Sequence, residues 1–213
     1  MKTKSLLLFI MAFCLLTTAN GQISPNIIYP AQGTFTAQDY PFDGVFGYSY
    51  NASIYNKSSI GLSGRIRGFT FYVETASPDS VTITISIKQL TNPMFGGYDT
   101  YANTSLGATE VYSGKVAFNT VGEKVINFQT VFDYDNSMHL GVYISAAWGG
   151  TGPAVAPKFR CKTIDSSVEY ITQAWGQNNS FPTAQTGQLT NYLPAIGIKF
   201  IAPDQPAIGA LLD

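Results

Sequence analysis

The segment Val81–Lys88 constrains the fold of this chain more than any other, because four β-branched apolar residues alternate in it with four polar ones. A period of two is typical of a β-strand with one buried and one wet face. The same alternation returns in three later segments, and shorter apolar runs predict two more strands. These segments lie at 139–144, 158–162, 196–200, 69–73 and 126–128.

Clusters of Gly, Pro, Asn, Asp and Ser separate the predicted strands and are typical of turns. No window has the apolar spacing of a helix. Many short, one-sided strands predict either two sheets packed face to face or a barrel, and we favour an all-β, two-sheet antiparallel β-sandwich. The expected core residues are Val81, Ile83, Ile85, Ile87, Leu140, Val142, Ile144, Ile196, Ile198 and Phe200.

The N-terminal segment Met1–Gly21 has the pattern of a secretory signal peptide. Lys2 and Lys4 form its basic region, an apolar run follows over 6–16, and small residues precede the expected cleavage site. We therefore expect a protein that is secreted or held at the cell surface, with the periplasm as the alternative location. The predicted organisation continues with an N-terminal arm at 22–34, the sandwich domain at 35–202 and a C-terminal tail at 203–213.

Two cysteines are present, and Cys14 lies inside the predicted signal peptide. The mature protein would keep Cys161 alone, so no intramolecular disulfide is expected in spite of the oxidising destination. Cys161 alternates with Arg160 and Lys162, which predicts a buried thiol that serves as a small apolar side chain.

Charge is sparse and balanced, with 12 basic against 13 acidic residues, and two of the basic residues lie in the predicted signal peptide. No basic cluster is present, which argues against nucleic acid as a partner. No apolar run after the signal peptide approaches membrane-spanning length, so no membrane span is expected.

Seven stretches follow one another along the chain in a distinctive order. They are YSYNASIYNKSSIG at Tyr48–Gly61, GRIRGFTFYV at Gly64–Val73, VTITISIKQLTN, VYSGKV at Val111–Val116, FQTVFDYDNSMHLGVYI at Phe128–Ile144, KFRC and PAIGIKF. This succession resembles a β-sandwich repeat of large surface proteins from gut-dwelling and gliding Gram-negative bacteria, found near gingipain-type adhesin regions, fibronectin type III repeats and surface proteases. The resemblance covers roughly residues 35–201 and implies a jelly-roll-like sandwich with an adhesive or substrate-binding role, without catalytic residues.

The sequence offers little of the chemistry that an enzyme needs. No Gly-rich phosphate loop and no nucleophile-elbow motif is present. His139 is the single histidine, and it precedes an inward leucine, which predicts a solvent-facing ring. We therefore expect no catalytic residue and no cofactor. A hydrolase that gathers two carboxylates across strands is the least favoured alternative.

One turn holds oxygen ligands close together, at Asp133, Asp135 and Asn136. Loops of this kind bind calcium in some sandwich domains, although the spacing does not match an EF-hand. The alternatives are a structural calcium ion and a solvated turn with side chain-to-backbone hydrogen bonds, of which the turn is favoured.

Two tryptophans lie beside glycines in or next to the predicted long loops 146–157 and 175–194. Counting strand directions places both loops at one end of the sandwich, and places Tyr98 and Tyr101 at the other end with Asp133 and Asp135. Exposed aromatic rings with nearby amides suit a glycan or a protein partner. The predicted ligand site is Trp148, Trp175, Asn178, Asn179 and Gln188. The alternative is that both indoles cap the core.

Three functions remain open at this stage. The favoured one is a non-catalytic binding or adhesion module for a glycan or an extracellular protein. The second is a structural subunit whose arm, Gln22–Gln38, adds to the sheet edge of another subunit, so that the protein is a monomer or self-assembles weakly. The third is the carboxylate hydrolase.

Overall fold

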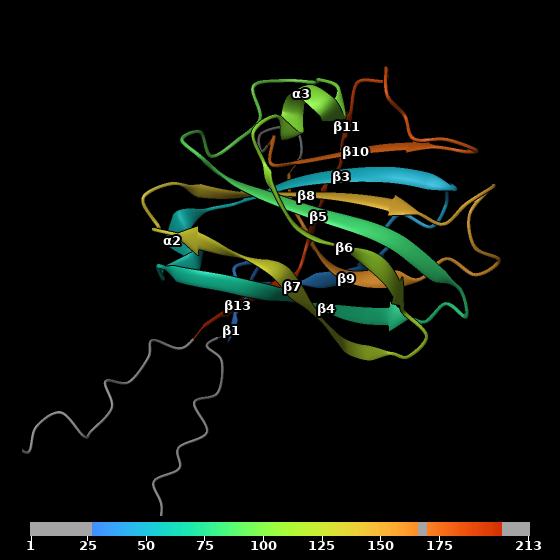
Figure 1. The fold of residues 1–213 in the computed structure, drawn as a ribbon, viewed down its shortest axis with the longest axis horizontal. Coiled ribbons are helices and arrows are strands. Elements are labelled where there is room, and N and C mark those ends of the chain that lie inside the picture. Colours follow the sequence, from blue (N-terminus) through green and yellow to red (C-terminus); the bar gives the residue numbers. More distant parts are fainter. Residues whose placement is uncertain (1–26, 166–169, 202–213) are drawn as a thin grey trace, which may run out of the picture.

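The computed structural model describes residues 27–165 and 170–201, which form two antiparallel β-sheets packed face to face (Figure 1). The predicted all-β sandwich is therefore confirmed. The predicted signal peptide, residues 22–26 of the predicted arm and the tail 203–213 lie outside the described residues. Within the described part of the chain, no helix is long and apolar enough to cross a membrane.

One sheet, here called the β4 sheet, has the order β1-β13-β4-β9-β12, with β2 paired to β9 and β7 paired to β4. The other, the β5 sheet, has the order β11-β10-β3-β8-β5-β6. The β4 sheet contains β1 (Ile27–Ile28), β2 (Phe35–Gln38), β4 (Gly64–Thr75), β7 (Gly122–Tyr134), β9 (Lys158–Thr163), β12 (Tyr192–Pro194) and β13 (Ile196–Phe200). The β5 sheet contains β3 (Tyr48–Tyr55), β5 (Ser80–Leu90), β6 (Thr109–Ala117), β8 (His139–Ala147), β10 (Thr172–Gln177) and β11 (Gln188–Leu189).

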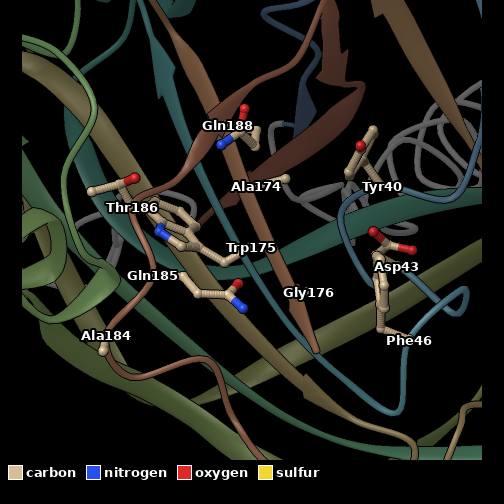
Figure 2. Close-up of a pocket in the computed structure, with 10 residues that line it drawn as sticks. All are labelled: Tyr40, Asp43, Phe46, Ala174, Trp175, Gly176, Ala184, Gln185, Thr186 and Gln188. Atoms are coloured by element: carbon tan, nitrogen blue, oxygen red, sulfur yellow. The ribbon is translucent and has the colours of Figure 1, made fainter. Parts of the chain in front are cut away.

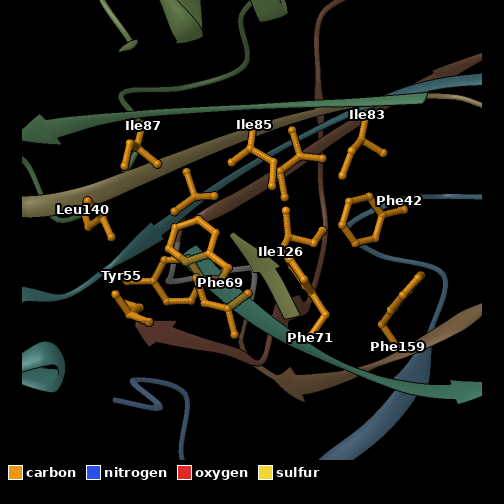
Figure 3. Packing of buried hydrophobic residues seen from close by; sticks show 14 of the residues in the cluster. Phe42, Tyr55, Phe69, Phe71, Ile83, Ile85, Ile87, Ile126, Leu140 and Phe159 are labelled. Carbon is orange, nitrogen blue, oxygen red and sulfur yellow. The ribbon is translucent and has the colours of Figure 1, made fainter. Parts of the chain in front are cut away.

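The core lies between the two sheets and contains the whole set of residues predicted from the alternation (Figure 3). Each of those ten side chains is at most 2 % exposed. Ile83, Ile85 and Ile87 come from β5 and Leu140 from β8, and they meet Phe69 and Phe71 of β4. Burial of one such side chain stabilises the fold by about 1.5–3 kcal/mol. The period-two pattern therefore accounts for the packing of one sheet against the other.

One end of the core is aromatic and holds the connection between β2 and β3 in place. The ring of Phe42, from this connection, lies 4.9 Å from Phe71, 4.7 Å from Phe118 and 5.0 Å from Phe159, measured between centroids. The pairs with Phe71 and Phe159 have the edge-to-face geometry that aromatic rings prefer. The connection is thus fixed by a buried ring to the β4 sheet and to the β6–β7 connection.

Cys161 is fully buried, as predicted, and its thiol donates a hydrogen bond of 3.4 Å to the backbone carbonyl of Tyr40. Burial raises the pKa of the Cys161 thiol well above its usual range, with the charge of Asp39 as a second cause. The thiol is therefore neutral at physiological pH and acts as part of the core.

Several local features differ from the sequence predictions. The described chain contains two helices, α2 (Lys57–Ile60) and α3 (Tyr101–Ser105), which are too short to carry a helical period. The segment predicted as a weakly patterned arm forms β1 and β2, which pair with β13 and β9 of the same chain. The loop predicted to start at Trp175 instead begins after Gln177, because β10 extends to that residue.

Candidate functional site

A pocket of about 530 Å³ lies at the edge of the β5 sheet, where β10 extends beyond its short partner β11. We call it the edge pocket. Figure 2 shows Tyr40, Asp43 and Phe46, from the β2–β3 connection, on the opposite side of β10 from Gln185 and Thr186. Gln188 of β11 completes its polar lining. The pocket thus joins three segments that are far apart in the sequence.

Small residues on β10 make room for this pocket. Ala174 and Gly176 alternate with Trp175, so they face the interior while the indole lies on the outer face of the sheet. The ring of Phe46 packs directly against Gly176, where a Cβ atom would lie 2.2 Å from the ring. A larger residue at 176 would displace Phe46 and with it one wall of the edge pocket.

Asp43 is the one carboxylate among the described residues that line the edge pocket. It is 7 % exposed, and its Oδ1 accepts a hydrogen bond of 3.0 Å from the backbone amide of Val45. Burial, helped by the negative charge of Asp39, raises the pKa of Asp43 to about 6. The group therefore changes between charged and neutral forms close to neutral pH.

Tyr40 supplies a phenol beside this carboxylate. Burial, followed by the charges of Asp43 and Asp39, raises the pKa of Tyr40 to about 12. Its hydroxyl is therefore neutral at physiological pH and can both donate and accept a hydrogen bond. The ring stacks on Tyr192 with centroids 6.3 Å apart, which fixes its position.

Trp175 lines the edge pocket, but its indole is only 3 % exposed. The indole nitrogen donates a hydrogen bond of 3.1 Å to the carbonyl of Asp99, and the ring of Tyr101 lies edge-on with a centroid distance of 5.5 Å. Gly187 closes over the ring so tightly that a Cβ atom there would lie 2.4 Å from it. Trp175 thus supports the wall of the pocket and offers little surface for stacking.

The other predicted site residues hold loops together at the same end of the β5 sheet. Strands β8 and β10 both pair antiparallel with β3, and both end opposite Tyr48. The loops that follow these two strands therefore leave the sheet at the same end, as predicted. The backbone amide of Gly47 donates a hydrogen bond of 3.1 Å to the side-chain oxygen Oδ1 of Asn178. The backbone amide of Asn179 donates one of 3.0 Å to the backbone carbonyl of Gly150. Neither asparagine is among the residues that line the edge pocket.

The two tryptophans do not converge on one cleft, and this part of the predicted geometry is wrong. Trp148 packs against the core between the sheets, and its indole nitrogen donates a 2.7 Å hydrogen bond to the carbonyl of Phe42. Trp175 belongs to a separate cluster on the outer face of the β5 sheet, with Ala52 and Tyr143. A shared end does not place two side chains on the same face of a sheet.

The prediction that Tyr101 lies at the opposite end from Trp175 is also wrong. The chain after β5 folds back along the outer face of the β5 sheet and carries α3 over it (Figure 1). Backbone hydrogen bonds from Phe95 to Tyr170 and from Gly187 to Asp99 hold it there, at 2.7 and 2.8 Å. The ring of Tyr101 stacks on Tyr50 with centroids 3.8 Å apart.

A polar strip lies on the inner face of the sheet behind the edge pocket. Asn51 pairs with Ala174, Ser49 with Gly176 and Ser53 with Thr172, and all four polar side chains of this strip are at most 2 % exposed. Among the described residues, no partner exists for Ser49 Oγ, Asn51 Nδ2 or Thr172 Oγ1. This part of the interior is therefore polar, in contrast to the apolar core farther along the same sheet.

The predicted calcium ligands are engaged with protein groups. Asp133 lies 3.5 Å from Arg65, with both side chains exposed, and Asp135 Oδ1 accepts the amide of Ser137 at 2.8 Å. Asn136 has a positive φ of 58° and accepts the hydroxyl of Tyr134 at 3.1 Å. The described part of the chain contains no group of three or more His, Cys, Asp or Glu side chains that could hold a metal ion. Calcium binding stays a prediction.

His139 lies at the start of β8, away from the residues that line the edge pocket. Its Nδ1 accepts a hydrogen bond of 3.4 Å from the backbone amide of Lys57. Partial burial, with the nearby positive charge of Lys57, lowers the pKa of His139.

Asp43, Tyr40 and Gln185 are members of the candidate site that the sequence did not indicate. Tyr40 and Asp43 belong to YPFDG, a segment without strand alternation that begins two residues after the predicted arm Gln22–Gln38. The signal that could have found them is the combination of two aromatic residues and a carboxylate around a turn.

Comparison with models of known protein families gives no match to this chain, and comparison with curated protein sequences gives none either. The protein is therefore classified from its own fold and site: it is an all-β, two-sheet sandwich with a polar pocket at one sheet edge.

Proposed function

We propose that this protein is a secreted, non-catalytic binding module that holds a saccharide in the edge pocket. The observation that carries the proposal is the make-up of the pocket lining: two exposed amides at Gln185 and Gln188, a neutral phenol at Tyr40 and a carboxylate at Asp43. Its volume of about 530 Å³ falls within the range of about 300–1,000 Å³ that is usual for small-molecule sites.

Sugar hydroxyls donate and accept hydrogen bonds at the same time, so a saccharide site needs both kinds of partner. The amides of Gln185 and Gln188 supply both kinds, Tyr40 supplies a hydroxyl, and Asp43 accepts. The ring of Phe46 adds an apolar wall against which the C–H groups of a sugar can pack. The predicted signal peptide and the resemblance to adhesin-type modules support the same function.

The binding function is favoured over hydrolysis by the number of carboxylates. Glycoside hydrolysis needs two carboxyl groups on opposite sides of the bond that breaks. Among the described residues, Asp43 is the one carboxylate that lines the edge pocket, so this lining lacks the second carboxyl group that such hydrolysis uses. The assembly function is less favoured because the described residues of the proposed donor arm pair with β9 and β13 of their own chain.

The proposal is tested by presenting the purified protein to an array of immobilised oligosaccharides and measuring the affinity of each hit by calorimetry. The double variant Gln185→Ala, Gln188→Ala should fold normally, because both side chains are exposed, and should bind the hit at least tenfold more weakly. Asn119→Ala, an exposed amide in the β6–β7 turn outside the pocket, is the matched control. Unchanged affinity in the double variant would refute the proposed site, and the release of reducing sugar would favour the hydrolase.

A further inference from the structure

A second pocket, of about 330 Å³, lies on the β4 sheet beneath the chain segment that crosses from β1 to β2. We call it the crossover pocket. Tyr29, Ala31 and Gln32 come from the crossing segment, Phe35 is the first residue of β2, and the remaining lining residues come from the sheet and its loops. None of its lining residues belongs to the edge pocket.

The floor of the crossover pocket contains a buried hydroxyl group that has no partner in the part of the chain that the structure describes. Thr70 of β4 lines the pocket and is 1 % exposed. Its Oγ1 has no hydrogen-bond partner among the described residues. A buried hydroxyl of this kind lowers the stability of the fold unless a bound molecule satisfies it, so its position marks a place where a ligand gains a hydrogen bond.

Arg160 forms a wall of the crossover pocket and is held rigidly. Its guanidinium carbon lies 3.6 Å from the centroid of Tyr72 and 5.8 Å from that of Phe35. Its Nε donates a hydrogen bond of 2.7 Å to Glu74, which also balances its charge. Because Nε is bound to Glu74 and the guanidinium lies against the ring of Tyr72, Arg160 is fixed in position, and its five N–H donors exceed what the bond to Glu74 uses.

The opposite side of the crossover pocket accepts hydrogen bonds. Glu123 of β7 lies beside Tyr72 in the sheet register, and its carboxylate accepts a bond of 3.0 Å from the hydroxyl of Tyr29. The residues Tyr29 and Phe35 are 39 % and 37 % exposed, so neither is closed off from a ligand. The pocket therefore combines aromatic faces, donors and acceptors.

We propose that the crossover pocket is a second saccharide site, which binds one uncharged sugar ring independently of the edge pocket. An uncharged sugar offers apolar C–H faces to Tyr29, Phe35 and Tyr72 and offers hydroxyls to Thr70, Glu123 and Arg160. The lining carboxylate of Glu123 disfavours an acidic sugar, because the positive charge of Arg160 is already balanced by Glu74, and Arg160 disfavours a basic sugar. The proposal deepens the proposed saccharide-binding function, but its site shares no residue with the edge pocket.

The test is a titration of the ¹⁵N-labelled protein with D-glucose, D-galactose, D-mannose and N-acetyl-D-glucosamine, followed by two-dimensional NMR. We expect at least one of these sugars to shift the backbone amides of Thr70, Tyr72 and Glu123 with saturation. D-glucuronate and D-glucosamine are the charged probes and should shift these amides less. The absence of a saturating shift with all four neutral sugars up to solubility, or stronger binding of a charged probe, would overturn the proposal.

Two variants separate binding from folding. Thr70→Val removes the unpartnered hydroxyl at nearly constant volume, so it should keep or raise the melting temperature while weakening sugar binding by about tenfold. Val121→Ala, at an exposed position in the β6–β7 turn, is the control and should change neither quantity. If Thr70→Val binds as tightly as the native protein, the hydroxyl is not a ligand contact and the proposal fails.

The same titration distinguishes this site from the edge pocket. In the double variant Gln185→Ala, Gln188→Ala the shifts at Thr70, Tyr72 and Glu123 should persist with the same dissociation constant. If these shifts disappear in the double variant, the two pockets are not independent and the proposal is overturned. If sugars shift only the edge-pocket amides, the proposed function stands and the crossover site is refuted.

Discussion

The indole nitrogen of Trp148 donates a 2.7 Å hydrogen bond to the backbone carbonyl of Phe42, whose own ring lies in the aromatic end of the core. This contact joins the end of β8 to the β2–β3 connection, two segments 106 positions apart in the sequence. The same connection carries Tyr40, Asp43 and Phe46, so Trp148 is bonded from inside the sandwich to the segment that supplies one side of the edge pocket.

Replacement of this indole tests the connection. Trp148→Phe keeps an aromatic ring but leaves the carbonyl of Phe42 without its donor, so we expect the free energy of unfolding to fall by about 1–3 kcal/mol. Chemical denaturation followed by circular dichroism measures the change. Equal stability of Trp148→Phe and the native protein would show that the hydrogen bond is replaced by water. Val45→Ala, at an exposed position of the same connection, is the control.

Because residues of β5 alternate between the buried and the outer face, substitutions at two neighbouring positions should change the free energy of unfolding by very different amounts. Ile85 is fully buried, so Ile85→Ala should lower the free energy of unfolding by about 2–5 kcal/mol through lost burial and a cavity. Ser86→Ala, one residue along and on the outer face, should change it by less than about 0.5 kcal/mol. Urea denaturation of both variants measures the contrast, and similar losses would contradict the inward assignment.

Cys161 should react with thiol reagents only when the protein opens. The thiol is fully buried and burial raises its pKa, so little thiolate forms and little of it is reachable. Labelling with a chromogenic disulfide in native buffer should be slow and should become fast in denaturant. Val121→Cys, at an exposed position, supplies the fast control. Native-state labelling at the control rate would place Cys161 at the surface.

Asp43 predicts an unusual pH dependence of stability. Burial raises its pKa to about 6 from 3.8, so the folded protein holds this proton more tightly than the unfolded chain does. The destabilising effect of its charge is therefore complete above pH 6 and disappears as the pH falls toward 4. Asp43→Asn keeps the acceptor for Val45 and should raise the free energy of unfolding at pH 7 by up to about 3 kcal/mol.

The measurement is thermal or chemical unfolding of Asp43→Asn and the native protein from pH 4 to pH 8. The difference in the free energy of unfolding should be largest at the alkaline end and close to zero at pH 4. A difference that stays constant over this range, or that grows as the pH falls, would contradict the assignment of a raised pKa to Asp43.

The core could be predicted well from the sequence, because every second residue of a strand faces the same side of the sheet. Val81, Ile83 and Ile85 needed no knowledge of their partners, since any sandwich must bury that face. Trp175 was misplaced because the end of a strand depends on its neighbours, and β10 extends as far as its register with β3 allows. Local composition around Trp175, rich in Gly and Asn, resembles a loop.

The candidate sites were harder to predict because their residues come from segments that meet only in the folded protein. The chain after β5 returns along the sheet through backbone contacts such as that between Phe95 and Tyr170, which no local pattern encodes. Asp43 and Thr70 are ordinary residues in sequence terms. Their interest comes from burial, which raises the pKa of Asp43 and leaves the hydroxyl of Thr70 without a partner among the residues that the structure describes.

The pairing of β1 with β13 has a mechanical consequence. Ile27 lies opposite Lys199 and Ile28 opposite Ile198, so the first and last described strands are antiparallel neighbours. The start of β1 and the end of β13 therefore lie at the same end of this strand pair. A force that pulls the two strands apart from this side breaks their hydrogen bonds one after another instead of all at once. Under such a force, β1 would separate from β13 first. Tyr29, which follows β1, would then leave the sheet before the force reaches the core between the two sheets.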